Sequence, residues 1–179
     1  MEKPHVTKAK KARQVNRILK SMIITFFDIK GIVHKELVPT GQTVNSGLYC
    51  EVLRRLLEKV RRHRPQLWRE QIWLLQHDNA PSHTSVLTYQ FLAKNKIAVI
   101  PHPSYSPDLA PCNFFLFPKM KLKLKGRRID TIEEIQAESQ RVLDTLTEKD
   151  FQKAFQKWRR RWDRCLHAGG NYFEGDGSR

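Results

Sequence analysis

Residues 72–83, IWLLQHDNAPSH, decide how this chain folds. The run IWLLQ at 72–76 is continuously apolar, which is typical of a buried strand, and it ends directly before His77 and Asp78. A second apolar run, IAVI, follows at 97–100. Between the two runs, apolar residues recur at helical spacing: Val86, Leu87, Phe91 and Leu92. A strand, a helix over 83–94 and a second strand predict a right-handed parallel crossover, with Asp78 at the carboxyl end of its first strand.

Upstream, two β-rich runs are separated by a short turn. SMIITFFD at 21–28 and IVHKELV at 32–38 flank Asp28 to Gly31, so the pattern predicts an antiparallel hairpin. The next segment, 44–64, predicts an amphipathic helix that is capped by Asn45 or Ser46. Its apolar stripe consists of Leu48, Tyr49, Val52, Leu53, Leu56, Leu57 and Val60.

Downstream of the crossover lies a proline-rich loop, PHPSYSPDLAP, which predicts a helix from near Pro111 to Gly126 with Asn113 in its first turn. Capping signals open two further helices: Thr131 with Glu134, and Thr147 with Asp150. The last helix carries an apolar stripe, which we expect to be core rather than a base-stacking platform: Phe151, Ala154, Phe155, Trp158, Trp162, Cys165 and Leu166.

This order of elements predicts an α/β fold with a ribonuclease-H-like mixed sheet, in which an antiparallel hairpin and parallel strands are flanked by helices and the first strand is missing. In that arrangement, a residue at the end of the first parallel strand meets one on the helix after the second. Asp78 and Asn113 occupy these two places.

Composition narrows the class of partner. The chain has 179 residues and a net charge of +15, from 33 Lys and Arg against 18 Asp and Glu, which favours a polyanion such as nucleic acid over a membrane. No apolar run is long enough to span a bilayer. The three cysteines lack metal-type spacing, so we expect them to be packing residues in an intracellular protein.

Several motifs in one order resemble a known family. HDNAPSH with Asp78, SPDLAP, Asn113 after 34 intervening residues, and the terminal RWDRCLHAGGNYFEGDG are similar to the catalytic domain of mariner transposases, from about residue 12 onward. The resemblance implies ribonuclease-H-like enzymes in which three acidic residues hold two Mg²⁺ or Mn²⁺ ions that cut and rejoin DNA. The second acid falls on Asp78 and the third on Asn113, which are therefore the candidate catalytic and metal-binding residues.

The chemistry explains why an asparagine in place of the third acid, at Asn113, matters. Two dications roughly 3.5 to 4 Å apart activate the nucleophile and stabilise the leaving oxygen, and anionic ligands offset their repulsion. Asn113 keeps an oxygen donor but lacks the charge. In that family the first acid lies on an opening strand, which belongs upstream of this sequence. The family's helix-turn-helix modules also belong upstream. Asp28 is not expected to replace that acid, because Asp in this position is typical of a hairpin turn.

Other polar residues near the motif have structural interpretations. His77 and His83 could carry a proton or contact a phosphate, but a histidine at a strand end more often orders its loop. Asn79 could cap the following helix or orient Asp78. Asp108 could be a metal ligand, although an aspartate after proline is more often turn chemistry or a cap.

The DNA-contact candidates form one dense cluster: Lys119, Lys121, Lys123, Lys125, Arg127 and Arg128. From its composition, we expect the basic segment 1–19 to be flexible. It could be a nuclear address or a phosphate-binding arm, or it could simply be solvated. We expect residues 20–179 to form the transposase-type domain. We therefore expect a nuclear, DNA-binding protein, a possible homodimer, with impaired catalysis. The alternatives are an active metal-dependent endonuclease and a dimerisation module without nuclease activity.

Overall fold

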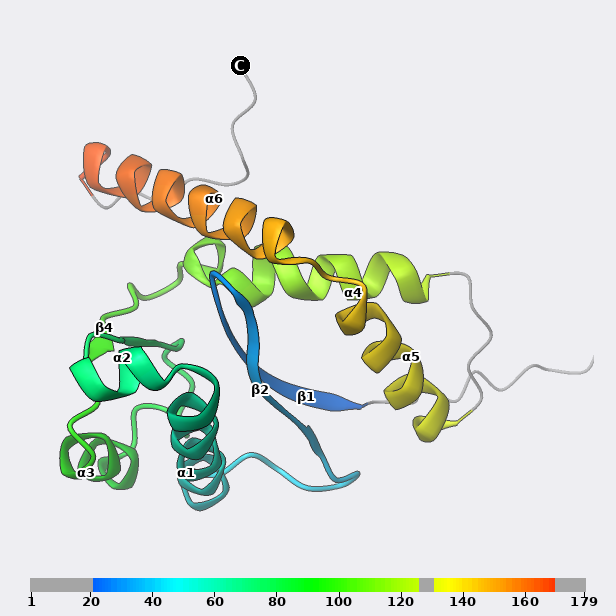
Figure 1. The fold of residues 1–179 in the computed structure, drawn as a ribbon, viewed down its shortest axis with the longest axis horizontal. Coiled ribbons are helices and arrows are strands. Elements are labelled where there is room, and N and C mark those ends of the chain that lie inside the picture. The colour runs from blue at the N-terminus through cyan, green and yellow to red at the C-terminus, as the bar shows by residue number, and fades with distance from the viewer. Residues whose placement is uncertain (1–20, 126–130, 170–179) are drawn as a thin grey trace, which may run out of the picture.

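The hairpin lies at the centre of the fold, in the part of the chain that the computed structural model describes, residues 21–125 and 131–169 (Figure 1). Strands β1 (Met22–Asp28) and β2 (Gly31–Val38) pair antiparallel, and their register shifts between Phe26 and Phe27. The predicted hairpin is confirmed. Its β-branched and aromatic residues suit a pleated surface, and Asp28 closes the turn.

The two faces of the hairpin are covered by different helical layers, because successive side chains of a strand point to opposite sides. Phe26 and Val33 pack against the core that contains α1 (Ser46–His63), whereas Phe27 and Ile32 pack against the core of the C-terminal helices. Figure 1 shows the hairpin between these two layers.

Helix α1 forms as its sequence predicts. Asn45 is the N-cap, and its side-chain oxygen accepts a hydrogen bond from the backbone nitrogen of Leu48 at 2.9 Å. Leu48 is half-buried, and Cys50 joins the stripe. The buried residues of α1 are Tyr49, Cys50, Val52, Leu53, Leu56, Leu57 and Val60. A short helix that was not predicted, α2 (Pro65–Glu70), follows directly, with proline in its first turn.

The parallel crossover is present, but its strands are short. β3 (Leu75–Gln76) pairs parallel with β4 (Val99–Ile100), and α3 (Val86–Lys94) connects them. The predicted strand 72–76 was too long, since Ile72 and Leu74 are exposed. The apolar stripe predicted for α3 was also wrong in part, because Val86 and Leu87 are exposed. The buried face of α3 instead carries Thr88 and Leu92.

The two strand pairs do not form one continuous sheet within the described residues. A cavity of about 360 Å³ lies between them, lined by residues of both pairs, among them Thr25 and Phe27 of β1 and Leu75 of β3. The sequence predicts a single mixed sheet. The described residues instead form a hairpin and a separate parallel pair, with an apolar cavity between them.

The predicted helix after the proline-rich loop begins with an irregular turn. A 3₁₀ turn, η1 (Pro107–Leu109), precedes a π-helical turn, η2 (Cys112–Leu116), which continues as α4 (Phe117–Leu124). Pro118 lacks a backbone N–H and therefore cannot complete the regular hydrogen-bond ladder at this point, which accounts for the irregularity.

The last two helices begin at the predicted caps. Capping boxes open α5 (Ile132–Asp144) at Thr131 and α6 (Glu148–His167) at Thr147. The stripe of α6 is core only in its first half: Phe151 and Ala154 are buried, whereas Leu166 is 71% exposed. The remaining stripe residues are half-buried: Phe155, Trp158, Trp162 and Cys165. The three cysteines are free, and the described helices include none that is long and apolar enough to cross a membrane.

Candidate active site

Asp78 stands two residues after β3, where the sequence analysis places it. Its side chain is about half exposed, at 52%. The Oδ1 atom accepts hydrogen bonds from the backbone nitrogen of Ala80 at 3.1 Å and from Nδ1 of His83 at 2.8 Å. The hydrogen bond from His83 is the main cause that lowers the pKa of Asp78 to about 2, so the carboxylate is ionised at neutral pH.

A stack of three rings supports this carboxylate. Tyr49 of α1 lies beneath the loop, with its ring centroid 4.1 Å from that of His83, and the His77 and His83 rings stack at 5.0 Å. The Tyr49 hydroxyl lies 2.9 Å from Nδ1 of His77. Burial lowers the pKa of His77 to about 4, so this ring is neutral near pH 7, with a proton on only one of its two nitrogens. Both histidines make local contacts that order the loop.

A second set of hydrogen bonds joins the Asp78 loop to the loop after β4. The Asn79 side chain donates from Nδ2 to the backbone oxygen of His102 at 2.8 Å, and Nε2 of Gln76 lies 3.1 Å from Nδ1 of His102. The capping role considered for Asn79 was therefore wrong, because the N-cap of α3 is Ser85. Its hydrogen bond acts on the loop that carries Asp78 rather than on the Asp78 side chain.

Asn113 lies in the π-helical turn η2 with its side chain exposed. Its neighbour Cys112 indicates how close this turn is to Asp78. Burial, and after it the charge of Asp78, raises the pKa of the Cys112 thiol to about 12. The turn that carries Asn113 is thus within electrostatic reach of Asp78, although they are 35 positions apart.

The two other acids that were considered as metal ligands are each held by an arginine. Asp28 forms a bidentate pair with Arg64, in which Nε donates to Oδ2 at 2.5 Å and Nη2 to Oδ1 at 2.9 Å. Asp28 Oδ1 also accepts from the backbone nitrogens of Lys30 and Gly31, as a turn residue does. Asp108 lies in η1 with its Oδ1 3.6 Å from Nη1 of Arg161 on α6. Both acids therefore have structural partners.

These residues do not fit a centre for two divalent ions. No group of three or more His, Cys, Asp or Glu side chains that could hold a metal occurs within residues 21–125 and 131–169. Asp78 offers one carboxylate, of which one oxygen is occupied by His83, and Asn113 offers a neutral oxygen. A pair of dications requires more anionic charge than this arrangement supplies.

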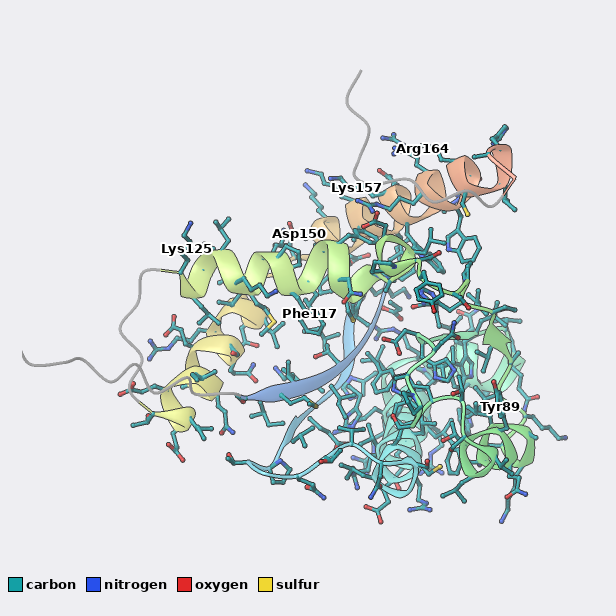
Figure 2. The ribbon with its side chains drawn as sticks, turned by 180° about the vertical axis from the view of Figure 1, so that it is seen from behind. Tyr89, Phe117, Lys125, Asp150, Lys157 and Arg164 are labelled. Carbon is teal, nitrogen blue, oxygen red and sulfur yellow. The ribbon has the colours of Figure 1, made fainter. Side chains whose placement is uncertain are left out.

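The lysines predicted to contact DNA are placed on α4, whereas Arg127 and Arg128 lie outside the described residues. Lys119 forms an ion pair with Asp150 at 2.6 Å and lies over the Phe115 ring. Lys121, Lys123 and Lys125 are exposed. Figure 2 shows Lys125 at the end of α4 that is remote from the Asp78 loop.

The contact of Tyr49 with the Asp78 loop was not predicted, because Tyr49 was assigned only to the apolar stripe of α1. Tyr49 is 1% exposed, and its hydroxyl reaches His77 across 28 sequence positions. One signal was available, because a buried tyrosine needs a hydrogen-bond partner for its hydroxyl and a histidine ended a predicted neighbouring strand. No comparable sign of the pair between Arg64 and Asp28 is present in the sequence.

Comparisons with known proteins extend these observations. A family model described as "Transposase (partial DDE domain)" matches residues 3–70. The Mariner Mos1 transposase of Drosophila mauritiana is 33% identical over 158 residues, which are 87% of this chain but 45% of that protein, so the chain spans less than half of this relative.

Two solved structures are similar over most of the chain. The Mos1 transposase catalytic domain with Raltegravir and Mn has a TM-score of 0.80 at 32% identity, over 86% of this chain and 78% of that one. The Mos1 mariner paired end complex with Mn has a TM-score of 0.82 at 31% identity, over 97% of this chain and 52% of that one. These matches confirm the predicted ribonuclease-H-like fold class.

Proposed function

The chain belongs to the mariner transposase family, and from this membership we propose that it is a transposase-derived DNA-binding domain with impaired phosphodiester cleavage. One observation carries the proposal. Asp78 is the one carboxylate at the strand-end site in the described residues that is not held by an arginine, and the matching position on the helix side is Asn113. The fold of the family's catalytic domain is retained, and this chain has a net charge of +15.

DNA is the proposed partner because the net charge of +15 favours a polyanion and because a relative of 31% identity is known from a paired end complex. Contacts from lysine and arginine to phosphates release counterions. We therefore expect binding that weakens steeply with salt and depends little on sequence. Strongly site-specific or salt-insensitive binding would contradict this part of the proposal.

We also propose weak binding of Mg²⁺ or Mn²⁺, a proposal supported by the solved Mos1 catalytic domains that contain Mn or Mg. In our proposal Asp78 and Asn113 would be the protein ligands, and the bound ion would supply Lewis-acid chemistry at a phosphate. The chain's own residues hold the Asp78 carboxylate in its ionised form through His83 and fix the loop through Asn79. With one anionic ligand, the affinity for a second ion should be low.

Nuclear localisation and a homodimer belong to the proposal as well. A DNA-binding domain of this charge would act where DNA is, and the exposed second half of α6 offers half-buried tryptophans, Trp158 and Trp162, to a second copy. Residues 20–179 would act as this one domain. Light scattering with and without duplex DNA tests the dimer, and imaging of the tagged chain tests the location.

A nicking assay on supercoiled plasmid with Mn²⁺ tests the central proposal. Wild type, Asp78→Ala and the matched control Asp163→Ala, which removes an exposed acid on α6, are compared at equal concentration. We expect all three to bind the plasmid and none to nick it above background. Nicking by wild type and Asp163→Ala that is abolished in Asp78→Ala would show an active endonuclease instead.

A further inference from the structure

The outer side of α6 carries a stripe of positive charge whose residues do not form a continuous run in the sequence. At about 3.6 residues per turn, its five cations fall within roughly 80° of the helix circumference. This basic stripe consists of Lys149, Lys153, Lys157, Arg160 and Arg164. Figure 2 shows Lys157 and Arg164 along α6. All except the half-buried Arg164 are exposed.

The opposite side of α6 fixes the direction in which the stripe faces. Phe151 and Ala154 are buried against α4 and α5, and Nε1 of Trp158 donates a hydrogen bond to the backbone oxygen of Leu109 at 2.8 Å. These contacts prevent the helix from rotating about its axis. The stripe therefore points away from the core over the length of the helix.

Acidic neighbours do little to neutralise the stripe. Asp150 borders it and is already paired with Lys119 of α4 at 2.6 Å. Asp163 lies roughly 40° beyond its other edge. No ion pair of Lys149, Lys153 or Arg160 is present among residues 21–125 and 131–169. The positive charge of these three residues is thus available to an anionic partner.

The lysines of α4 lack this alignment. They occur at every second position, and residues two apart on a helix lie on different sides. Lys119 and Lys123 therefore lie roughly 160° from Lys121 on the helix circumference. The dense cluster in the sequence is divided between two sides of α4, whereas the more dispersed cations of α6 come together.

We propose that the basic stripe of α6 binds the phosphate backbone of duplex DNA, as a contact surface separate from the Asp78 site. From Lys149 to Arg164 the stripe is about 22 Å long, at about 1.5 Å per residue. Duplex DNA carries one phosphate charge per about 1.7 Å of axis, so Lys149, Lys153 and Arg160 meet enough phosphates over that length. The stripe has no aromatic side chain for base stacking, which disfavours single strands. This inference rests on the DNA binding proposed above.

The experiment measures how DNA affinity depends on salt. Fluorescence anisotropy follows binding of a labelled random duplex of about 20 base pairs between about 50 and 200 mM NaCl. The test variant is Lys153→Gln with Arg160→Gln, two exposed residues in the middle of the stripe. The control, Arg54→Gln with Arg61→Gln, makes the same charge change at the same spacing on exposed positions of α1, which lies far from α6 in Figure 1.

Log affinity falls as log salt rises, and each phosphate contact adds about 0.9 to the magnitude of this slope. We expect the test variant to reduce the magnitude of the slope by about 1.8, because it removes two contacts. The control should leave the slope at the wild-type value. A charge-retaining variant, Lys153→Arg with Arg160→Lys, should also keep it. Circular dichroism spectra that match wild type show that each variant is folded.

Two outcomes would count against different parts of this account. If wild type binds the duplex and the α6 variant has the same slope as wild type, or if the α1 control lowers the slope equally, the basic stripe is not the contact surface and the inference alone fails. If wild type does not bind the duplex at all, the proposed function fails together with the inference.

Discussion

Replacing Asp28 should destabilise the fold without changing metal binding, because its carboxylate joins the hairpin turn to the end of α1. Oδ1 accepts from the backbone nitrogens of Lys30 at 2.8 Å and Gly31 at 3.1 Å, and Arg64 binds both carboxylate oxygens. Gly31 has a φ of +135°, so the turn is one that most residues adopt poorly. The side chains of Asp28 and Arg64 are 26% and 15% exposed.

The size of the effect follows from these contacts. Asp28→Ala removes a bidentate charge-assisted pair, which contributes about 2 kcal/mol, and turn hydrogen bonds that contribute about 1 kcal/mol. It also leaves the charge of Arg64 without its partner. We expect a loss of about 3 kcal/mol for Asp28→Ala and about 2 kcal/mol for Asp28→Asn, which keeps one acceptor oxygen at the turn. At about 3 °C per kcal/mol for a chain of this length, Asp28→Ala should lower Tm by about 9 °C.

Urea unfolding gives the free energy, and thermal unfolding with and without Mn²⁺ gives the effect on metal binding. A double-mutant cycle with Arg64→Met should show a coupling energy of about 2 kcal/mol. The rise in Tm that Mn²⁺ causes in wild type should be the same in Asp28→Asn. An unchanged stability would contradict the structural role of Asp28 in the turn. A Mn²⁺ effect that disappears in Asp28→Asn would show that Asp28 serves as a metal ligand.

Three further predictions concern the Asp78 loop. Asn113→Asp should tighten Mn²⁺ binding, measured by calorimetry, without yielding strand transfer; full strand transfer by this single variant would contradict the proposal of impaired catalysis. Tyr49→Phe should cost about 1 kcal/mol in urea unfolding, because the His77 ring loses its hydrogen bond, and an unchanged stability would count against that bond. In EDTA, stability should decrease as pH falls from about 6.5 to about 4, because the unfolded state protonates His77 at its ordinary pKa of 6.5 and the folded state only near 4. His77→Gln should remove about 2 kcal/mol of that decrease, allowing for partial exposure.

Local signals in the sequence predicted much of the fold. The cap at Asn45, the buried stripe of α1 and the capping boxes at Thr131 and Thr147 are formed by residues within a few positions of one another, so the sequence shows both partners at once. The hairpin is local for the same reason. Its turn needs only Asp28 and a glycine three residues later.

Features that depend on distant packing were predicted less well. Whether Val86 or Thr88 of α3 is buried depends on how the helix rotates against α1, and the apolar pattern alone chose the wrong side. Leu166 also continues the apolar stripe of α6, yet its side chain is exposed. The short strands β3 and β4 lie beside a cavity, which an apolar run of five residues does not reveal.

The candidate site was predictable in position but not in its connections. Asp78 after β3 and Asn113 at the start of a helix followed from the order of elements, and the structure confirms both positions. The irregular π-helical turn that carries Asn113 was not predicted, although Pro118 is a residue that disturbs the regular hydrogen-bond ladder of a helix. The division of the α4 lysines between two sides follows from helix geometry alone and shows that charge density in a sequence does not locate a charged face.

The most direct test counts the manganese ions that bind to each chain. Electron paramagnetic resonance during a Mn²⁺ titration distinguishes free from bound ions, in wild type and in Asp78→Ala. We predict that wild type binds at most one Mn²⁺ ion, weakly, and that Asp78→Ala binds none at this site. Two tightly bound ions in wild type, both lost in Asp78→Ala, would contradict the proposal that this site lacks the negative charge for a two-metal reaction.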